Sequence, residues 1–166
     1  MQERIAMLTY SITDIKKFMN LLLKEQAFDG LLLREAKLTT SSYYEIDGSL
    51  QTEFFDTEEL ASLPSTKYVS WALQKPILFS MMKGRHLPLR FRIVLALPDS
   101  AIEQLLTKAD CSIPASQVTG LFLNIIYENH ELMLTTGTSL SIFTMDKSVD
   151  ELWEDYIREF LGRHEL

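Results

Sequence analysis

The feature that most constrains the fold is the stretch of residues 60–98, which is rich in apolar residues and cations and contains no Asp or Glu. The whole chain of 166 residues has 16 basic and 23 acidic residues, a net charge of −7. Without the six cations of this stretch, the remaining 10 basic and 23 acidic residues give −13. A segment of charge +6 in such a chain must contribute to the core and also present a positive surface. Its cations are Lys67, Lys75, Lys83, Arg85, Arg90 and Arg92.

The last part of this stretch has the pattern of a strand that passes from the surface into the interior of a sheet. After Pro88, apolar residues alternate with Arg90 and Arg92, which places both arginines on one face of the strand, about 7 Å apart. In residues 93–97 the polar residues stop, as in a strand covered on both faces. The pattern therefore predicts an interior strand whose first residues present two arginines.

The first part of the stretch is predicted to be helical. Pro76 cannot lie inside a helix without losing a hydrogen bond, so we expect it to open a second helical piece over residues 77–83. Gly84 then ends that piece. Two shorter helices are predicted, one starting at Asp56 and one capped by Asp99 or Ser100, since Asp and Ser are both favourable at a helix start.

Longer helices are predicted towards both ends of the chain. Residues 11–26 and residues 148–161 carry apolar side chains at three- and four-residue spacing, which places a hydrophobic stripe on one face of each helix. Ser148 and Glu151 have the spacing of a capping box at the start of the second of these helices.

Two other parts of the chain have the pattern of strands. Residues 31–46 and 50–55 are predicted to form a hairpin around Asp47-Gly48, a pair that favours tight turns. Residues 118–143 are predicted to form three strands, with turns at residues 128–130 and at Gly137. The pattern as a whole predicts one compact α+β domain over residues 1–166, with N-terminal and C-terminal helices packed on mostly antiparallel sheet.

A weak internal repeat accompanies this pattern. Residues 30–56 share six identities with residues 120–146 when the chain is shifted by ninety positions. An internal duplication would explain the matches, and so would coincidence, because the offset was selected for them.

Composition narrows the class of protein. The 46% hydrophobic and 23% charged content is that of a folded globular protein. The single cysteine, Cys111, leaves no internal disulfide and is typical of a reducing cytoplasm. No apolar run approaches the roughly 18–20 residues of a membrane span, and the first residues lack a signal-peptide core. We therefore expect a cytoplasmic protein with no membrane segment, and the acidic total argues against a general nucleic-acid binder, though not against a local basic patch.

The motifs of catalysis and metal binding are missing from the sequence. His86, His130 and His164 lack a second ligand at the spacing of a metal site. Cys111 follows Asp110, whose charge disfavours a reactive thiolate. There is no glycine-rich phosphate or dinucleotide motif, and paired carboxylates lie on helix surfaces. We expect no cofactor, no metal and no catalytic residue, so the sequence favours a binding protein over an enzyme.

The candidate site is a group of cations within ten residues of the chain. Guanidinium groups bind carboxylate or phosphate through two parallel hydrogen bonds, which makes an anion the expected ligand. The group consists of Lys83, Arg85, His86, Arg90 and Arg92.

Three interpretations of this group remain open from the sequence. It could bind an acidic protein partner or an acidic helix of a second subunit, or an enzyme or sensor could use it to hold a phosphorylated small molecule. Alternatively, Asp150, Glu154 and Asp155 of the final helix could neutralise it internally. A deep apolar pocket beside the arginines would favour the small molecule, and a flat surface would favour the protein partner.

The chain also resembles a small bacterial protein family of unknown function. The likeness covers nearly the whole chain, but its motifs are structural positions and imply no catalytic or binding residue. They are Asp47-Gly48, the series Trp71, Pro76, Lys83-Gly84 and Pro88, and the ending Asp146-Lys147-Ser148, Trp153 and Phe160-Leu161.

Overall fold

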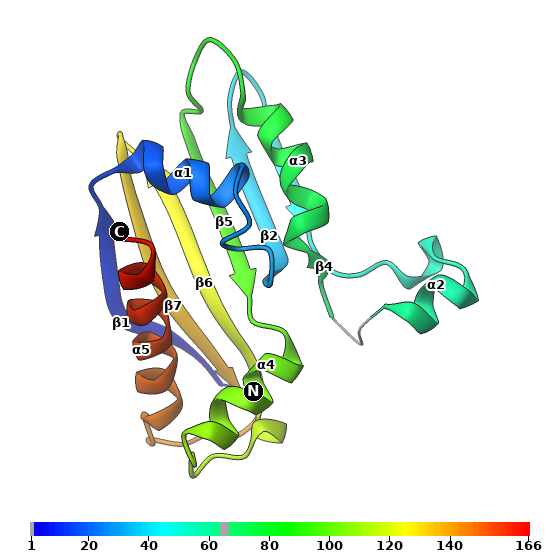
Figure 1. Ribbon diagram of the computed structural model, residues 1–166, viewed down its shortest axis with the longest axis vertical. Coiled ribbons are helices and arrows are strands. Elements are labelled where there is room, and N and C mark those ends of the chain that lie inside the picture. Colours follow the sequence, from blue (N-terminus) through cyan, green and yellow to red (C-terminus); the bar gives the residue numbers. More distant parts are fainter. Residues whose placement is uncertain (1, 64–66) are drawn as a thin grey trace.

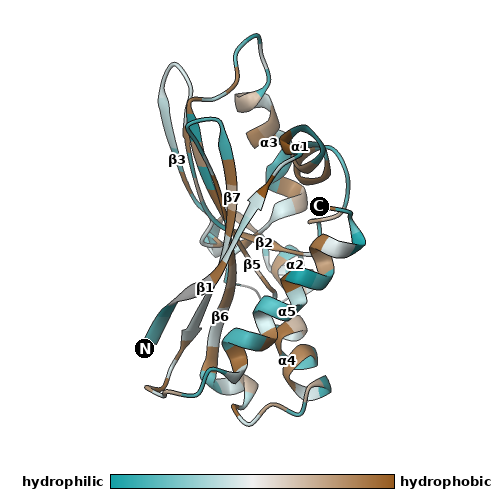
Figure 2. Ribbon diagram, turned by 90° about the vertical axis from the view of Figure 1, so that its left-hand side faces the viewer, coloured by the Kyte–Doolittle hydropathy of each residue, from teal (hydrophilic) through white to brown (hydrophobic). Residues whose placement is uncertain are grey.

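A computed structural model of the chain describes residues 2–63 and 67–166, with side chains described for all of these except residues 5–7 (Figure 1). The chain forms two layers, an antiparallel sheet and a set of helices on one of its faces (Figure 2). The predicted single α+β domain is confirmed.

The sheet contains seven strands within the described residues, in the order β1-β7-β6-β5-β2-β3, with short β4 also paired to β2. Every neighbouring pair is antiparallel. The strands are β1 (Gln2–Ile12), β2 (Leu32–Thr39), β3 (Tyr43–Asp47), β4 (Val69–Ser70), β5 (Arg90–Ala96), β6 (Val118–Glu128) and β7 (Glu131–Leu140).

Four helices cover one face of the sheet, and the other face carries none of them (Figure 2). They are α1 (Ile15–Leu23), α3 (Trp71–Met82), α4 (Asp99–Lys108) and α5 (Ser148–Arg163). The short helix α2 (Thr57–Ser62) projects away from the sheet (Figure 1) and has no buried residue. The 3-10 turns η1 (Thr52–Phe54) and η2 (Ala115–Gln117) complete the elements.

The interior strand predicted near the middle of the chain is confirmed as β5, which pairs with β2 on one side and β6 on the other. Phe91, Ile93 and Leu95 point into the main core beneath the helices. Arg90 and Arg92 are exposed on the helix-free face, which we call the open face. The alternation of the sequence therefore decided which side chains this strand presents.

Two buried tryptophans join elements of the core, Trp71 linking α3 to α1 and Trp153 linking α5 to β6. Trp71 is buried, and its indole N–H donates a hydrogen bond to the Leu22 carbonyl at 3.1 Å. The Trp153 indole N–H donates to the Phe122 carbonyl at 2.8 Å. A buried indole needs such a partner, because an unpaired donor in the core is destabilising.

The predicted hairpin turn at Asp47-Gly48 is wrong. The chain turns at residues 40–42, where the Thr40 N–H donates to the Ser42 carbonyl, and Asp47 is the last residue of β3. A Cβ on Gly48 would lie 1.8 Å from the Leu33 carbonyl oxygen, so the glycine permits close approach of two backbone segments. The predicted second arm at residues 50–55 contains the 3-10 turn η1 instead of a strand.

Several predicted boundaries also differ from the structure. The first predicted helix is shorter, as α1, and β1 precedes it as an edge strand that the apolar pattern did not reveal. Pro76 lies inside the continuous helix α3 instead of opening a second one. Gly137 lies inside the continuous strand β7, where it faces Phe122 across the pair with β6.

The start of the final helix is also built differently from the prediction. The N-cap residue of α5 is Lys147, and its side chain makes no capping hydrogen bond. The predicted capping box of Ser148 and Glu151 is therefore wrong. The Asp146 carboxylate accepts the Ser148 N–H at 2.9 Å in its place. The internal repeat of residues 30–56 and 120–146 stays a prediction.

Candidate functional site

The five side chains of the predicted site lie at the end of the sheet where β5 begins. Lys83 ends α3, and Arg85 and His86 follow in the connection to β5, the green loop at the top of Figure 1. All five side chains are exposed. We call this group, Lys83, Arg85, His86, Arg90 and Arg92, the β5 basic patch.

Neighbouring strands add further charge beside the two arginines. Lys37 of β2 lies directly opposite Arg92, so two cations are cross-strand neighbours on the open face. Such like-charge pairs are destabilising unless an anion lies near them. Glu128 of β6 lies opposite Arg90, and Lys37 pairs with Glu45 at 3.7 Å.

Within the described residues, no ion pair neutralises the β5 basic patch. In the part of the chain that the structure describes, none of its five side chains has a carboxylate oxygen within 4.0 Å, and the polar contact of Arg92 is a long bond to the Asn124 amide oxygen, 3.4 Å. The alternative in which the acids of the final helix neutralise it is therefore wrong. Asp150 instead pairs with Arg4, and Asp155 pairs with Arg158.

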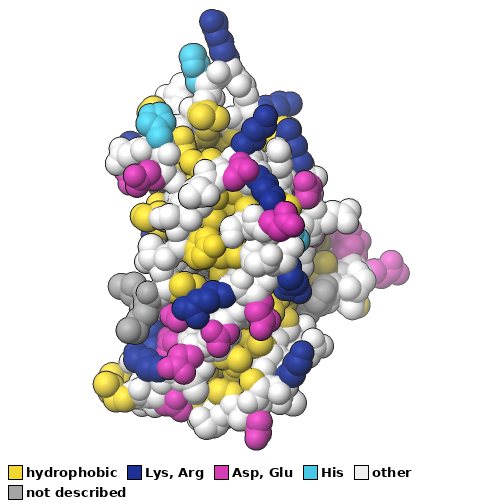
Figure 3. Space-filling model, turned by 60° about the vertical axis from the view of Figure 1, so that its left-hand side comes forward, with side chains coloured by type: hydrophobic (Ala, Val, Ile, Leu, Met, Phe, Trp, Pro, Cys, Tyr) yellow, Lys and Arg dark blue, Asp and Glu magenta, His cyan; other side chains and the backbone are white. Residues whose placement is uncertain are grey.

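Figure 3 shows a basic side chain and a histidine at the very top of the molecule, with basic and acidic side chains mixed below them. The cations that form ion pairs among residues 2–63 and 67–166 all lie outside the patch. They are Arg4, Lys17, Arg34, Lys37, Lys75 and Arg158.

Exposed leucines lie between the cations of the β5 basic patch. Leu87 is 77% exposed and Leu89 is 63% exposed. The Leu89 N–H donates to the Thr39 carbonyl at 2.9 Å, which holds this residue beside the end of β2. The patch therefore combines positive charge with apolar surface.

A groove of about 260 Å³ beside Arg92 is lined by two arginines that the sequence did not single out, Arg34 of β2 and Arg4 of β1. The Arg34 guanidinium lies 4.2 Å above the Phe122 ring and 3.3 Å from the Glu3 carboxylate. A bulge between Leu33 and Glu35 interrupts the β2–β5 pairing at this residue. No local signal could have joined Arg34 to Arg92, because their proximity depends on strand order.

A second missed feature is a buried ionic cluster that joins β1, β7 and the start of α5. Arg4 is only 7% exposed, and its Nη1 donates to the Asp150 carboxylate and to the Asp146 carbonyl, each at 2.5 Å. The Thr138 hydroxyl donates to the other Asp150 oxygen at 2.5 Å, and the second Arg4 amino group donates to the Thr144 carbonyl. The cluster ties the first strand to the segment that leads into α5.

Two aspartate carboxyl groups have a lowered pKa, and hydrogen bonds in the structure explain both shifts. The pKa of Asp146 is lowered chiefly because the Ser148 backbone N–H donates to its carboxylate, with a further hydrogen bond from the Ser112 hydroxyl at 3.0 Å. The pKa of Asp47 is lowered chiefly because the Ser49 backbone N–H donates to it at 2.9 Å. Both hydrogen bonds favour the ionised form.

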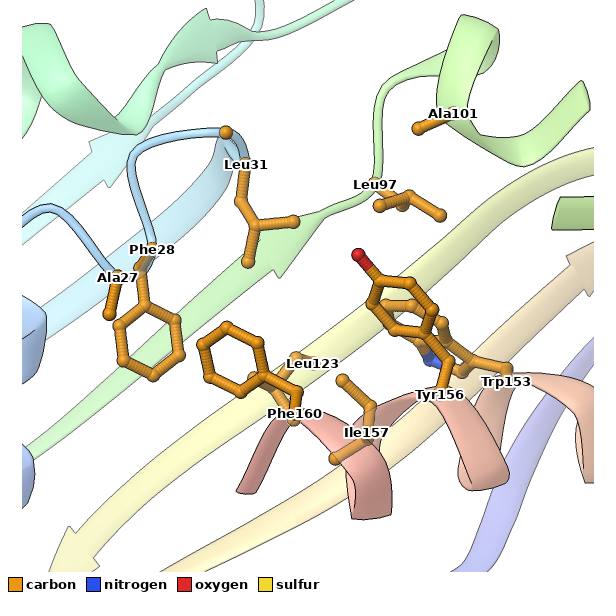
Figure 4. A pocket seen from close by; sticks show the side chains of 11 residues that line it. Ala27, Phe28, Leu31, Leu97, Ala101, Leu123, Trp153, Tyr156, Ile157 and Phe160 are labelled. Atoms are coloured by element: carbon orange, nitrogen blue, oxygen red, sulfur yellow. The ribbon is translucent and has the colours of Figure 1, made fainter. Parts of the chain in front are cut away.

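An apolar cavity of about 150 Å³ lies in the helical layer, on the other side of the sheet from Arg92 (Figure 4). Its walls come from the α1–β2 connection, the β5–α4 junction, β6 and α5. A deep apolar pocket beside the arginines would have favoured a small-molecule ligand there. This apolar cavity instead lies on the opposite face of the sheet from Arg92.

The described residues give little support for metal binding or for thiol chemistry. There, no three His, Cys, Asp or Glu side chains cluster in a way that could hold a metal ion. Cys111 is half-buried, with its Sγ 3.6 Å from the Ser148 hydroxyl. In the same part of the chain, no helix is both long enough and apolar enough to cross a membrane.

Comparison with known proteins places the chain in a family without assigning a role. No curated protein and no solved structure matches it. A family model described as a family of unknown function, DUF5721, matches residues 21–166, which contain α2 to α5, the β5 basic patch and the apolar cavity. Since the match covers most of the chain, this protein belongs to the DUF5721 family.

Proposed function

We propose that this protein is a non-catalytic binding protein whose β5 basic patch receives an acidic segment of a protein partner. The observation that carries the proposal is a group of four exposed cations and His86, close together in the chain, for which the described residues supply no carboxylate within 4.0 Å. An Arg or Lys that is free of internal carboxylates can pair with an incoming anion without first breaking an ion pair.

The leucines of the patch favour a protein segment over a small anion. Leu87 and Leu89 present apolar surface among the cations, and binding would remove it from water. A partner segment that alternates acidic and apolar side chains satisfies both features. Charge would set the rate and orientation of binding, and the leucines would add to its affinity.

The partner could be an unrelated acidic protein or a second copy of this chain. The exposed face of α5 carries Glu151, Asp155 and Glu159, so a second copy offers suitable charge. Sedimentation velocity separates the two sources, because self-association would be seen with the protein alone and would weaken with salt. The net charge of −7 disfavours nucleic acid as the partner.

A phosphorylated small molecule remains the second candidate, supported by the groove beside Arg92. Arg34, Arg92 and Asn124 line that groove, and both guanidinium groups can bind phosphate oxygens. This candidate places the ligand on the open face, whereas the protein segment would lie across the exposed end of β5.

A labelled peptide tests the first candidate directly. We expect a fluorescein-labelled peptide of alternating Glu and Leu to raise fluorescence anisotropy at low salt, and the R90A/R92A variant to bind it more weakly. Arg158→Ala is the matched control, because it removes an exposed arginine from α5. Binding that R90A/R92A leaves unchanged would overturn the site.

Competition separates the two candidates. We expect inorganic phosphate and ATP to displace the peptide no better than sodium chloride of equal ionic strength. Displacement by phosphate at a constant ionic strength, lost in Arg34→Ala, would favour the phosphorylated ligand instead. A cytoplasmic location completes the proposal and is supported by the single half-buried cysteine, Cys111.

A further inference from the structure

The apolar cavity beneath α5 has the dimensions of a binding site for one small ring. Its volume is about 150 Å³, roughly that of an enclosed apolar cavity in another protein that binds benzene. The inner wall is buried, since Phe28, Leu123 and Trp153 are each 1% exposed. Gly30 and Ala101 at the rim present almost no side chain, which leaves the cavity open to solvent.

The lining is aromatic and carries no charge. Phe28 and Phe160 meet with ring centroids 5.0 Å apart, and Trp153 and Tyr156 stack at 5.3 Å on the other side. No Asp, Glu, Lys or Arg is among the side chains that line the cavity. Aromatic walls favour an aromatic guest, and an ionised guest would lose its hydration without gaining a counter-ion.

One polar group points into this apolar space. The Tyr156 hydroxyl is directed towards Leu31 and Leu97 across the cavity (Figure 4). Tyr156 is half-buried, and within the residues that the structure describes its hydroxyl has no protein hydrogen-bond partner and is reached by solvent, whereas the buried Trp153 indole N–H is satisfied by the Phe122 carbonyl. A hydroxyl can donate and accept, so a guest with one neutral hydrogen-bonding substituent would pair with it.

We propose that this cavity is a binding site for a small neutral aromatic molecule with one hydrogen-bonding substituent, of the phenol type. The ring lies between the Phe28–Phe160 pair and the Trp153–Tyr156 pair, and the substituent meets the Tyr156 hydroxyl. The site lies on the opposite face of the sheet from Arg92, so it is independent of the function proposed for the β5 basic patch.

Three probes of equal ring size test the assignment on the full chain. Methyl NMR of Leu31, Leu97, Leu123 and Ile157 follows titration with toluene, p-cresol and benzoate. We expect toluene and p-cresol to shift these methyl signals in a saturable way, with p-cresol binding more tightly, and benzoate to leave them unchanged. The proposal would be overturned if neither neutral probe shifted the methyl signals, or if benzoate bound as tightly as the neutral probes.

Two kinds of variant locate the ring and its substituent. Tyr156→Phe should weaken p-cresol binding by roughly 3- to 10-fold, which is the effect of losing one neutral hydrogen bond. The affinity for toluene should stay unchanged, because toluene has no hydrogen-bonding substituent. Equal loss for both probes, or loss for neither, would overturn the role of the hydroxyl.

Filling the cavity is the complementary test. Ala101→Phe places a ring at the rim and should abolish binding of both neutral probes, and Ala27→Phe does the same from the opposite rim should A101F fold poorly. The control is Ala109→Phe, the same change at the exposed C-cap of the same helix, which should bind like the original protein. Binding that survives in the folded A101F or A27F variant would place the probes elsewhere and overturn the site.

Discussion

The Arg4 guanidinium and the Asp150 carboxylate, 146 residues apart in the chain, lie 2.5 Å apart and are largely buried. Their side chains are 4% and 15% exposed. The pair joins an edge strand to the start of α5, so it links the two ends of the chain. Removing one member of a buried ion pair is far more damaging than removing an exposed pair, because the other charge is left uncompensated.

Arg4→Ala should therefore lower the free energy of unfolding by about 3–5 kcal/mol. Asp150 would keep the Thr138 hydroxyl but lose its counter-ion. Urea denaturation followed by circular dichroism measures the change. Arg158→Ala is the control, since its pair with Asp155 is exposed and should be worth at most about 1 kcal/mol. A loss in R4A no larger than that in R158A would show that the cluster is not stabilising.

Stability should fall in acid partly because of Asp146. Its pKa is lowered in the folded protein, chiefly by the Ser148 N–H, so folding favours the ionised form. This contribution is present above the ordinary pKa of 3.8 and is lost as the pH falls through the lowered value. Asp146→Asn should flatten the dependence of the free energy of unfolding on pH below about 4.

The control for Asp146 is Glu103→Gln, which removes an exposed carboxylate from α4. Thermal unfolding between pH 2.5 and pH 7 compares the two variants with the original protein. The account of Asp146 is wrong if D146N and E103Q have the same slope in the acid range.

Two glycines should respond to alanine with opposite signs. A Cβ at Gly48 would lie 1.8 Å from the Leu33 carbonyl oxygen, so Gly48→Ala forces two backbone segments apart and should destabilise the protein by about 3 kcal/mol. A Cβ at Gly162, in the last turn of α5, would have no atom within 4 Å. Gly162→Ala should stabilise by up to about 1 kcal/mol, because alanine loses less entropy in a helix. Chemical denaturation of both variants checks the signs, and similar effects would contradict this reasoning.

Pro76→Ala should raise the melting temperature. Pro76 lies inside α3 and has no N–H for the helical hydrogen bond, and alanine restores that donor. A gain of about 1 kcal/mol would raise the midpoint by roughly 2–4 °C for a chain of this length. Differential scanning calorimetry measures it, with Pro88→Ala outside the helix as control. A lower midpoint in P76A would mean that the rigidity of proline in the unfolded chain dominates.

Some elements were predictable because their signals are local. The alternation around Arg90 and Arg92 identified β5, its exposed face and its buried second half, since side chains two residues apart share a face. The apolar spacing after Ser148 identified α5, because residues three and four positions apart share one face of a helix, and Val149, Trp153, Ile157 and Leu161 are buried there. The family resemblance is also confirmed by the DUF5721 match.

The errors arose where a residue type serves more than one purpose. Gly48 and Gly137 both resemble turn residues, yet one permits a close backbone approach and the other lies inside β7. Pro76 resembles a helix boundary but is tolerated within α3, whose packing against the sheet outweighs one missing hydrogen bond. β1 was missed because it is an edge strand, recognisable mainly by its long pairing with β7.

Periodicity along the chain was enough to assign an α+β domain, an arginine-bearing strand and a region of unbalanced positive charge. It could not show that Arg34 would approach Arg92, that Arg4 would meet Asp150, or that α5 would enclose an aromatic cavity. Those contacts depend on the strand order and on the packing of one helical layer against one face of the sheet. The reason is physical: side-chain spacing decides which face a residue occupies, but only the folded arrangement of distant segments decides what that face meets.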